Sequence, residues 1–201
     1  MPRISDERRE ARREQVLEAA RACLQEHGLE SVSMEMIVAR SGLSTGAVYG
    51  YFKGKNEIIN AAVAEGMAEL AEKIAPILED PVPPPLPQLL GKVLRTIIEF
   101  AQQRPGGIDR LTVAIHSWSH SQNNPDLKSA LNGAYRRLQG LFEETAWRSQ
   151  AAGMLDPQAN PAEVAELMTS ICLGFVVQRV MTGKATVQAH VHAFEVLLGA
   201  Q

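Results

Sequence analysis

The chain has 201 residues, enough for one or two domains with a sizeable core, and its net charge of −3 excludes a protein that binds nucleic acid through bulk positive charge. Residues 1–55 carry nine Lys and Arg against eight Asp and Glu, whereas the remainder carries eleven against fifteen. The less acidic first quarter contains four clustered arginines, which permit an anionic partner there: Arg8, Arg9, Arg12 and Arg13.

The only cysteines, Cys23 and Cys172, are far apart in the sequence, which favours two buried small hydrophobic residues in a reducing compartment over a redox pair. The charged N-terminus contains no apolar signal segment, and we find no apolar run as long as a membrane span. We therefore expect a cytoplasmic protein with no membrane partner.

Nearly every segment has helical periodicity and none alternates as a half-buried strand does, so we predict an all-α fold of about nine helices. The first helix is expected over residues 6–27, with Gly28 after its end. Ser33 is expected to cap a short second helix that ends at residues 41–42. Ser44 is expected to cap a third helix that stops near residues 53–54.

A fourth helix is expected from about Lys55, with Pro76 bending or ending it, and the segment "EDPVPPPLP" is expected to be a non-helical linker. Helices then follow, one of them stopping at "RPGG" (residues 104–107). The pair Asn124-Pro125 predicts one helix start. The pair Asn160-Pro161 predicts another, with Glu163 placed to complete a capping box.

The two short helices around residues 41–43 form the pattern of a helix-turn-helix, whose second helix enters the DNA major groove. The outward face of that helix has almost no side chains, and Thr45 and Tyr49 flank it. The hydroxyls of Thr45, Tyr49 and Tyr51 suit bases or phosphates, and the Ala47 methyl suits a thymine methyl. Alternatively, the glycines are loop residues and the tyrosines are half-buried in the core.

Lys55 is expected in the first turn of the fourth helix, where its charge and the free N–H groups suit a phosphate. Ser33, at the start of the second helix, can bind a neighbouring phosphate in the same way.

Residues 12–59, "RREQVLEAARACLQEHGLESVSMEMIVARSGLSTGAVYGYFKGKNEII", resemble the TetR family of bacterial transcriptional regulators. The resemblance implies a three-helix DNA-binding domain (residues 1–54) and a helical ligand-binding and dimerisation domain (residues 55–201). It implies a homodimeric repressor that binds a palindromic operator, with no cofactor. The residues and the resemblance together predict these DNA-binding positions: Ser33, Ser44, Thr45, Gly46, Ala47, Tyr49, Gly50, Tyr51 and Lys55. Positions 47, 50 and 51 depart from the common family pattern, so the operator sequence is not predicted.

The helices expected over residues 161–182 and 186–198 form the terminal pair of the chain. The first is apolar nearly all round, so we expect the pair to build a four-helix interface in a homodimer, as in the family. The alternative is a central core helix of the monomer.

The effector is expected to be a small hydrophobic or aromatic molecule, because few charges interrupt the apolar stripes of the later helices. The candidate pocket residues are Phe100, His116, Trp118, His120, Phe142, Trp147 and Phe175. His116 and His120 have the i, i+4 spacing of metal ligands, but no third ligand lies near them in sequence, so we expect no metal. The alternative function is an all-helical enzyme, or a small-molecule or metal-binding protein, that uses these two histidines.

Overall fold

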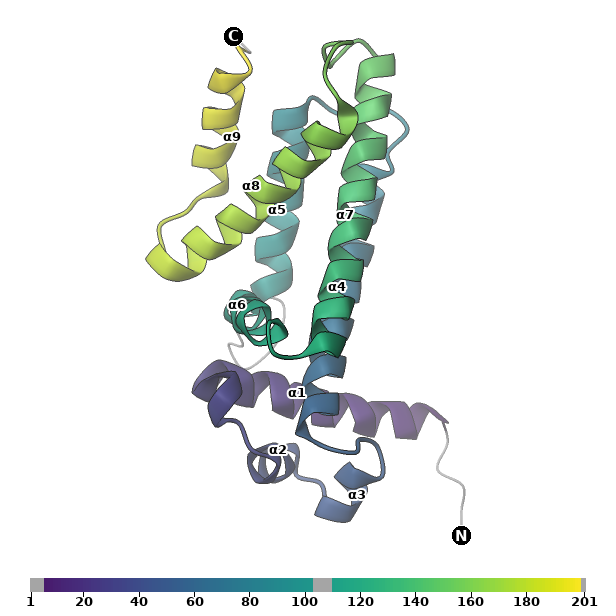
Figure 1. The fold of residues 1–201 in the computed structure, drawn as a ribbon, viewed down its shortest axis with the longest axis vertical. Helices are drawn as coiled ribbons and strands as arrows, with labels where there is room; N and C mark the ends of the chain where they lie inside the picture. The colour runs from purple at the N-terminus through teal and green to yellow at the C-terminus, as the bar shows by residue number, and fades with distance from the viewer. Residues whose placement is uncertain (1–5, 103–109, 200–201) are drawn as a thin grey trace. The chain divides into compact units, whose positions relative to one another are not determined.

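The computed structural model describes residues 6–102 and 110–199, and within these ranges the chain forms nine helices and no strand (Figure 1). The predicted all-α class is therefore confirmed. The helices have these bounds: α1 (Asp6–Ser31), α2 (Met34–Ser41), α3 (Thr45–Tyr49), α4 (Lys55–Leu78), α5 (Leu86–Gln102), α6 (Arg110–Ser121), α7 (Pro125–Ala151), α8 (Pro161–Thr182) and α9 (Val187–Leu197).

The chain folds into two compact units. The first comprises Met1–Gly66 and Arg104–Leu131, and the second comprises Met67–Gln103 and Asn132–Gln201. Helices α4 and α7 each contribute to both units. This division groups α6 with the N-terminal helices. The expected boundary between a DNA-binding domain (residues 1–54) and a ligand-binding domain (residues 55–201) is a functional division and remains a prediction.

The core of the first unit is built from α1, α2, α3, the start of α4, and Val113 of α6. Its apolar side chains recur at helical spacing on α1, and each fully buried Leu or Ile stabilises the fold by roughly 1.5–3 kcal/mol. The fully buried members are Val16, Leu17, Ala20, Leu24, Ile37, Val48, Ile58 and Ile59. This core holds the two short helices against α1 and α4.

Local signals at the helix ends are confirmed at three positions. The Ser33 side chain accepts a hydrogen bond from the Met36 amide, and the Ser44 side chain accepts one from the Ala47 amide, each at 3.3 Å. Gly28, with φ of 70° and ψ of 168°, interrupts α1 where its end was expected.

Three other expectations about helix ends need correction. Helix α3 ends at Tyr49, earlier than expected, and a turn follows it. Helix α4 continues through Pro76 to Leu78. Because Pro76 lacks an N–H, it removes only one backbone hydrogen bond, and its position in the last turn makes this loss tolerable. Helix α5 begins at Leu86, inside the segment expected to be non-helical, since Pro87 in its first turn lacks only an N–H that would be unpaired anyway.

The N-terminus of α8 uses Glu163 differently from a capping box. The Asn160 side-chain oxygen accepts from the Ala162 amide at 3.0 Å, as an N-cap does. The Glu163 carboxylate accepts from the Asn160 side-chain amide at 3.3 Å, whereas a capping box uses the backbone N–H.

The predicted helix end at residues 104–107 lies outside the described residues.

In the second unit, α5 packs against α8 and α9. The Phe175 ring of α8 meets the His190 ring of α9 edge-on, with centroids 5.0 Å apart. The expectation that no apolar run reaches the length of a membrane span is wrong for α8. Its mean hydropathy reaches 1.5 over an 18-residue window, although only 33% of that window is buried in the protein.

Candidate nucleic-acid interface

The turn between α2 and α3 is held by two hydrogen bonds to Ser41 and by the backbone conformation of Gly42. The Gln15 side chain of α1 donates to the Ser41 carbonyl at 2.6 Å, and the Leu43 amide donates to the Ser41 hydroxyl at 3.3 Å. Gly42 has φ of 65°, a left-handed conformation that glycine adopts without a steric penalty. The turn therefore sets the direction in which α3 leaves α2.

The inward face of α3 is anchored by Val48, which is completely buried, and by Phe52 just after the helix, which is 3% exposed. The opposite face carries Thr45 and Gly46, both exposed. A Cβ atom added at Gly46 would meet no atom within 4 Å. The outward face of α3 is therefore open and nearly free of side chains, which lets a helix backbone approach base edges closely.

The residues flanking this face differ in exposure. Tyr49 is 52% exposed, whereas Ala47 and Tyr51 are half-buried. Tyr51 packs against the core of the first unit, which agrees with the alternative that the tyrosines are half-buried core residues. Gly50 is exposed, and its amide donates to the Gly46 and Ala47 carbonyls at 3.1 Å each. Of the two tyrosines, Tyr49 offers the more accessible hydroxyl.

Lys55, in the first turn of α4, donates from Nζ to the Val32 carbonyl oxygen at 2.8 Å. Val32 directly precedes Ser33, so the bond brings the start of α4 beside the start of α2. The ammonium group has three donors, and this bond uses one of them. The sequence predicts that Lys55 and Ser33 contact two neighbouring phosphates. The bond to Val32 brings these two residues close together.

Ser33 has a competing partner on its own helix. A hydrogen bond from the Ser33 side chain lowers the pKa of the exposed Glu35 carboxyl below its ordinary value. The Ser33 hydroxyl would have to leave this carboxylate in order to donate to a phosphate, and a carboxylate beside a phosphate is repulsive. Ser33 is thus a weaker phosphate donor than its helix-start position suggests.

The arginine cluster of α1 is divided between structural and free positions. Arg13 pairs with Glu65 of α4 at 2.5 Å and lies over the Phe52 ring, with its Cζ 5.4 Å from the ring centroid. In the described part of the chain, Arg8, Arg9 and Arg12 are exposed and form no ion pair. Only these three arginines of the cluster are available to an anionic partner.

The predicted ligand-binding residues fall in both units. His116, Trp118 and His120 are half-buried in the first unit. In the second unit, Phe100, Phe142 and Phe175 are buried, and Trp147 is 58% exposed. No ligand tests these positions, so their role remains a prediction.

Both cysteines are free and buried, as expected. Burial raises the pKa of the Cys172 thiol to about 12, so this thiol is unreactive at neutral pH.

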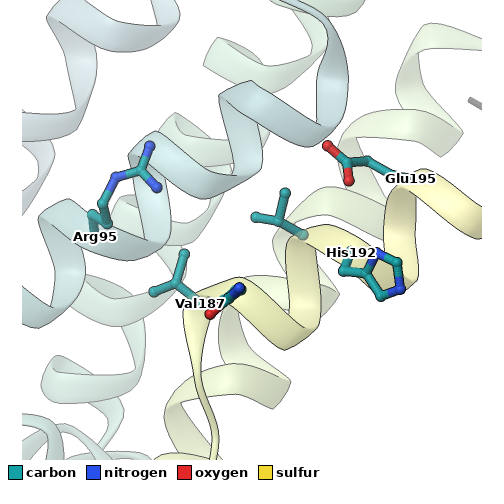
Figure 2. Close-up of a pocket in the computed structure, with 6 residues that line it drawn as sticks. Arg95, Val187, His192 and Glu195 are labelled. Atoms are coloured by element: carbon teal, nitrogen blue, oxygen red, sulfur yellow. The ribbon is translucent and has the colours of Figure 1, made fainter.

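A surface hollow of about 490 Å³ lies between α5 and α9 in the second unit (Figure 2). Arg95 of α5 and Glu195 of α9 lie on different sides of it, with Val187 at the start of α9 and His192 beside Glu195. Sequence reasoning missed this hollow, because its residues come from helices about 90 positions apart.

Two family models match the chain. Residues 16–62 match the model described as bacterial regulatory proteins, tetR family. Residues 88–197, more than half of the chain, match the model described as BetI-type transcriptional repressor, C-terminal. The chain belongs to the TetR family. This membership assigns it to regulatory proteins and not to enzymes, so the alternative of an enzyme built on His116 and His120 is set aside.

Individual TetR-family proteins resemble the chain to different extents. The HTH-type transcriptional repressor AcnR of Corynebacterium diphtheriae is 35% identical over 75 residues, which cover 37% of this chain and 40% of that protein. The alignment therefore spans less than half the length of this relative.

Two solved structures share the fold over nearly the whole chain. The SmeT–triclosan complex has a TM-score of 0.76 at 23% identity, and the alignment covers 93% of this chain and 91% of SmeT. A transcriptional regulator from Saccharomonospora viridis in complex with choline has a TM-score of 0.73 at 21% identity, with 96% and 97% covered. At these identities the likeness concerns the fold alone.

Proposed function

We propose that this TetR-family protein is a cytoplasmic repressor that binds a palindromic DNA operator as a homodimer and leaves it when a small hydrophobic or aromatic effector binds. The observation that carries the DNA-binding part is the open face of α3. Val48 and Phe52 anchor this helix from behind, and Gly46 leaves its front without a side chain. A duplex is the partner that this shape suits, because the helix backbone can approach the base edges.

Donors surround that face at positions suited to phosphates. Tyr49 offers an accessible hydroxyl, and Lys55 offers an ammonium held beside the start of α2. Phosphate contacts of this kind set the register of a helix in the groove, whereas the α3 face reads the bases. The AcnR relative is named a repressor, which favours repression over activation.

The homodimer is supported by apolar surface on the terminal helix pair. Leu167 and Met181 of α8 are 54% and 74% exposed, and Leu197 of α9 is 82% exposed. Such a set of exposed large apolar side chains marks an interface, since exposure to water is unfavourable for each of them. A second copy of the same helix pair would cover it, and the dimer would then carry two α3 helices, as a palindromic operator requires.

The effector class is supported by the apolar stripes of the second unit and by SmeT, whose structure contains triclosan. The S. viridis regulator contains choline instead, so a small cation is the competing class. In our proposal the effector binds one arrangement of the dimer better than another. Because the two α3 helices must match half-sites about 34–36 Å apart, a population shift away from that spacing lowers operator affinity.

The proposal is tested with the full-length protein and labelled duplexes from its own genomic neighbourhood, by fluorescence anisotropy at low and moderate salt. We expect one duplex containing an inverted repeat to bind at least 1,000-fold more tightly than a scrambled duplex, roughly the lower end for specific binding. Triclosan is the apolar aromatic probe and choline the cationic one.

Release by triclosan without release by choline supports the proposed effector class, and the reverse result contradicts it. Absence of binding to every duplex of the neighbourhood at low salt contradicts the proposed function itself.

A further inference from the structure

A second cavity lies within the first unit, between the C-terminal end of α1 and α6. Its volume is about 280 Å³. It is lined by His27, Gly28, Ser31, His116, Ser119, His120 and Asn123. Two of these residues, His116 and His120, are among those predicted to bind the effector, but the polar lining does not suit a hydrophobic or aromatic molecule.

Gly28 shapes one wall of this cavity. Its φ of 70° and ψ of 168° interrupt α1, so the backbone leaves the helical path beside α6. A Cβ atom added at Gly28 would lie 3.9 Å from Cε1 of His116. The interruption therefore lies at Gly28, beside the imidazole of His116.

The lining is rich in hydrogen-bond donors and contains no Asp, Glu, Lys or Arg. Three imidazoles, two hydroxyls and one side-chain amide face a small volume. His27 is 44% exposed at its side chain, and His116 and His120 are half-buried. Each imidazole has an N–H donor in its neutral form, so donors are available at several points of the lining.

One acidic side chain lies next to the lining, on α1. Glu26 of α1 lies 3.7 Å from Nε2 of His27. Both of its oxygens accept from the Arg40 guanidinium of α2, at 2.5 and 2.6 Å. That bidentate pair occupies most of the acceptor capacity of Glu26, which also lies within ion-pair distance of His27. No acidic side chain lines the cavity itself.

We propose that this cavity binds a small oxyanion, a carboxylate or phosphate, through His27, His116 and His120 with the hydroxyl of Ser119. The oxyanion supplies acceptors for the N–H and O–H donors of the lining. A metal site is disfavoured, because no group of three or more His, Cys, Asp or Glu in the described part of the chain is arranged to hold a metal ion. The site connects α1, which carries α2 and α3, to α6, so its ligand would act on the DNA-binding unit independently of the effector.

Calorimetric titration of the full-length protein with citrate and with inorganic phosphate, in a buffer without other oxyanions, tests the proposal. We expect saturable binding of at least one of these two anions to the wild-type protein. The double variant His116→Gln, His120→Gln should lose the binding, and Ser119→Ala should weaken it. The matched control is His192→Gln, an exposed histidine of α9, which should bind as the wild type does.

Circular dichroism shows whether the double variant is folded. Should it unfold, His27→Gln and Ser119→Ala become the deciding variants, since both residues are exposed to solvent. Absence of anion binding by the wild-type protein, or unchanged affinity in the folded variants, would overturn the proposal. Saturable zinc binding that the same variants abolish, without anion binding, would also overturn it and would identify a metal site. No DNA is present, so failure here leaves the operator proposal intact.

Discussion

The ammonium group of Lys55 and the carbonyl oxygen of Val32 are 2.8 Å apart, although 23 residues separate them in the chain. This hydrogen bond joins the first turn of α4 to the residue before the N-cap of α2. The positive ends of two helices and one ammonium group therefore lie close together. In the proposed complex, Lys55 is the donor of this group that would contact a phosphate of the duplex.

Replacing Lys55 with Met should weaken operator binding about tenfold and reduce the slope of log affinity against log salt by about 1, because one phosphate contact is lost. The bond to Val32 is also lost, so a loss of about 1 kcal/mol in the free energy of unfolding is expected. Anisotropy titrations at several salt concentrations and urea unfolding measure the two effects. Lys73→Met, at an exposed position later on α4, is the control. An unchanged salt slope in the Lys55 variant would remove Lys55 from the interface.

Tyr49 and Val48 are neighbours on α3 with opposite environments, so their substitutions should separate binding from stability. Tyr49 is 52% exposed, and Tyr49→Ala should weaken operator binding roughly tenfold with little change in unfolding. Val48 is fully buried, and Val48→Ala should destabilise the protein by roughly 2 kcal/mol through the cavity that it leaves. Anisotropy and urea unfolding on both variants check this, and a Tyr49 variant with normal affinity contradicts it.

The Glu26–Arg40 pair predicts a pH dependence of stability. The hydrogen bond from Arg40 lowers the pKa of Glu26 below its ordinary value. The folded-state pKa lies below the unfolded one, so the contribution is present above the unfolded value of about 4.3 and is lost as the pH falls through the folded value. Glu26→Gln should therefore lose less stability than the wild type between about pH 5 and pH 3. Thermal unfolding across this range measures the difference, and parallel curves for the two proteins would show that the pair contributes nothing.

The apolar surface of α8 and α9 predicts the oligomeric state. Replacing both Met181 and Leu197 with Glu should shift the protein from dimer to monomer, because charged side chains would be buried in the interface. Val82→Glu, at a position 76% exposed between α4 and α5, should leave the dimer intact. Light scattering coupled to size-exclusion chromatography measures the mass. A wild-type protein that is already monomeric would contradict the proposed interface.

Sequence reasoning predicted the features that depend on residues close together in the chain. Ser33 and Ser44 cap their helices through amides three positions ahead, and Gly42 ends α2 through its own left-handed backbone. The exposed face of α3 followed from the helical positions of Val48 and Gly46. Each of these depends on one turn of helix.

The features that sequence reasoning missed depend on tertiary contacts. The bond from Lys55 to Val32 joins residues of different helices, and the cavity of His27, His116 and His120 forms only because α6 packs against α1. The apolar residues of α8 predicted an interface, but the sequence pattern was not recognised as long enough to span a membrane. Glu163 accepts a hydrogen bond from the Asn160 side-chain amide, whereas its spacing predicted a bond from the Asn160 backbone N–H.

The central claim is that the empty face of α3 is the surface that enters the DNA groove, and Gly46→Leu tests it most directly. A side chain at Gly46 meets nothing within 4 Å in the protein alone, and leucine favours helix over glycine by up to about 1 kcal/mol. Gly133→Leu, at an equally open and exposed helical position of α7, is the matched control. We predict that Gly46→Leu keeps the wild-type stability and loses at least about 100-fold in operator affinity, as for two mismatched base contacts. Wild-type affinity in the Gly46→Leu protein would contradict the account, because the duplex would then not lie against this face.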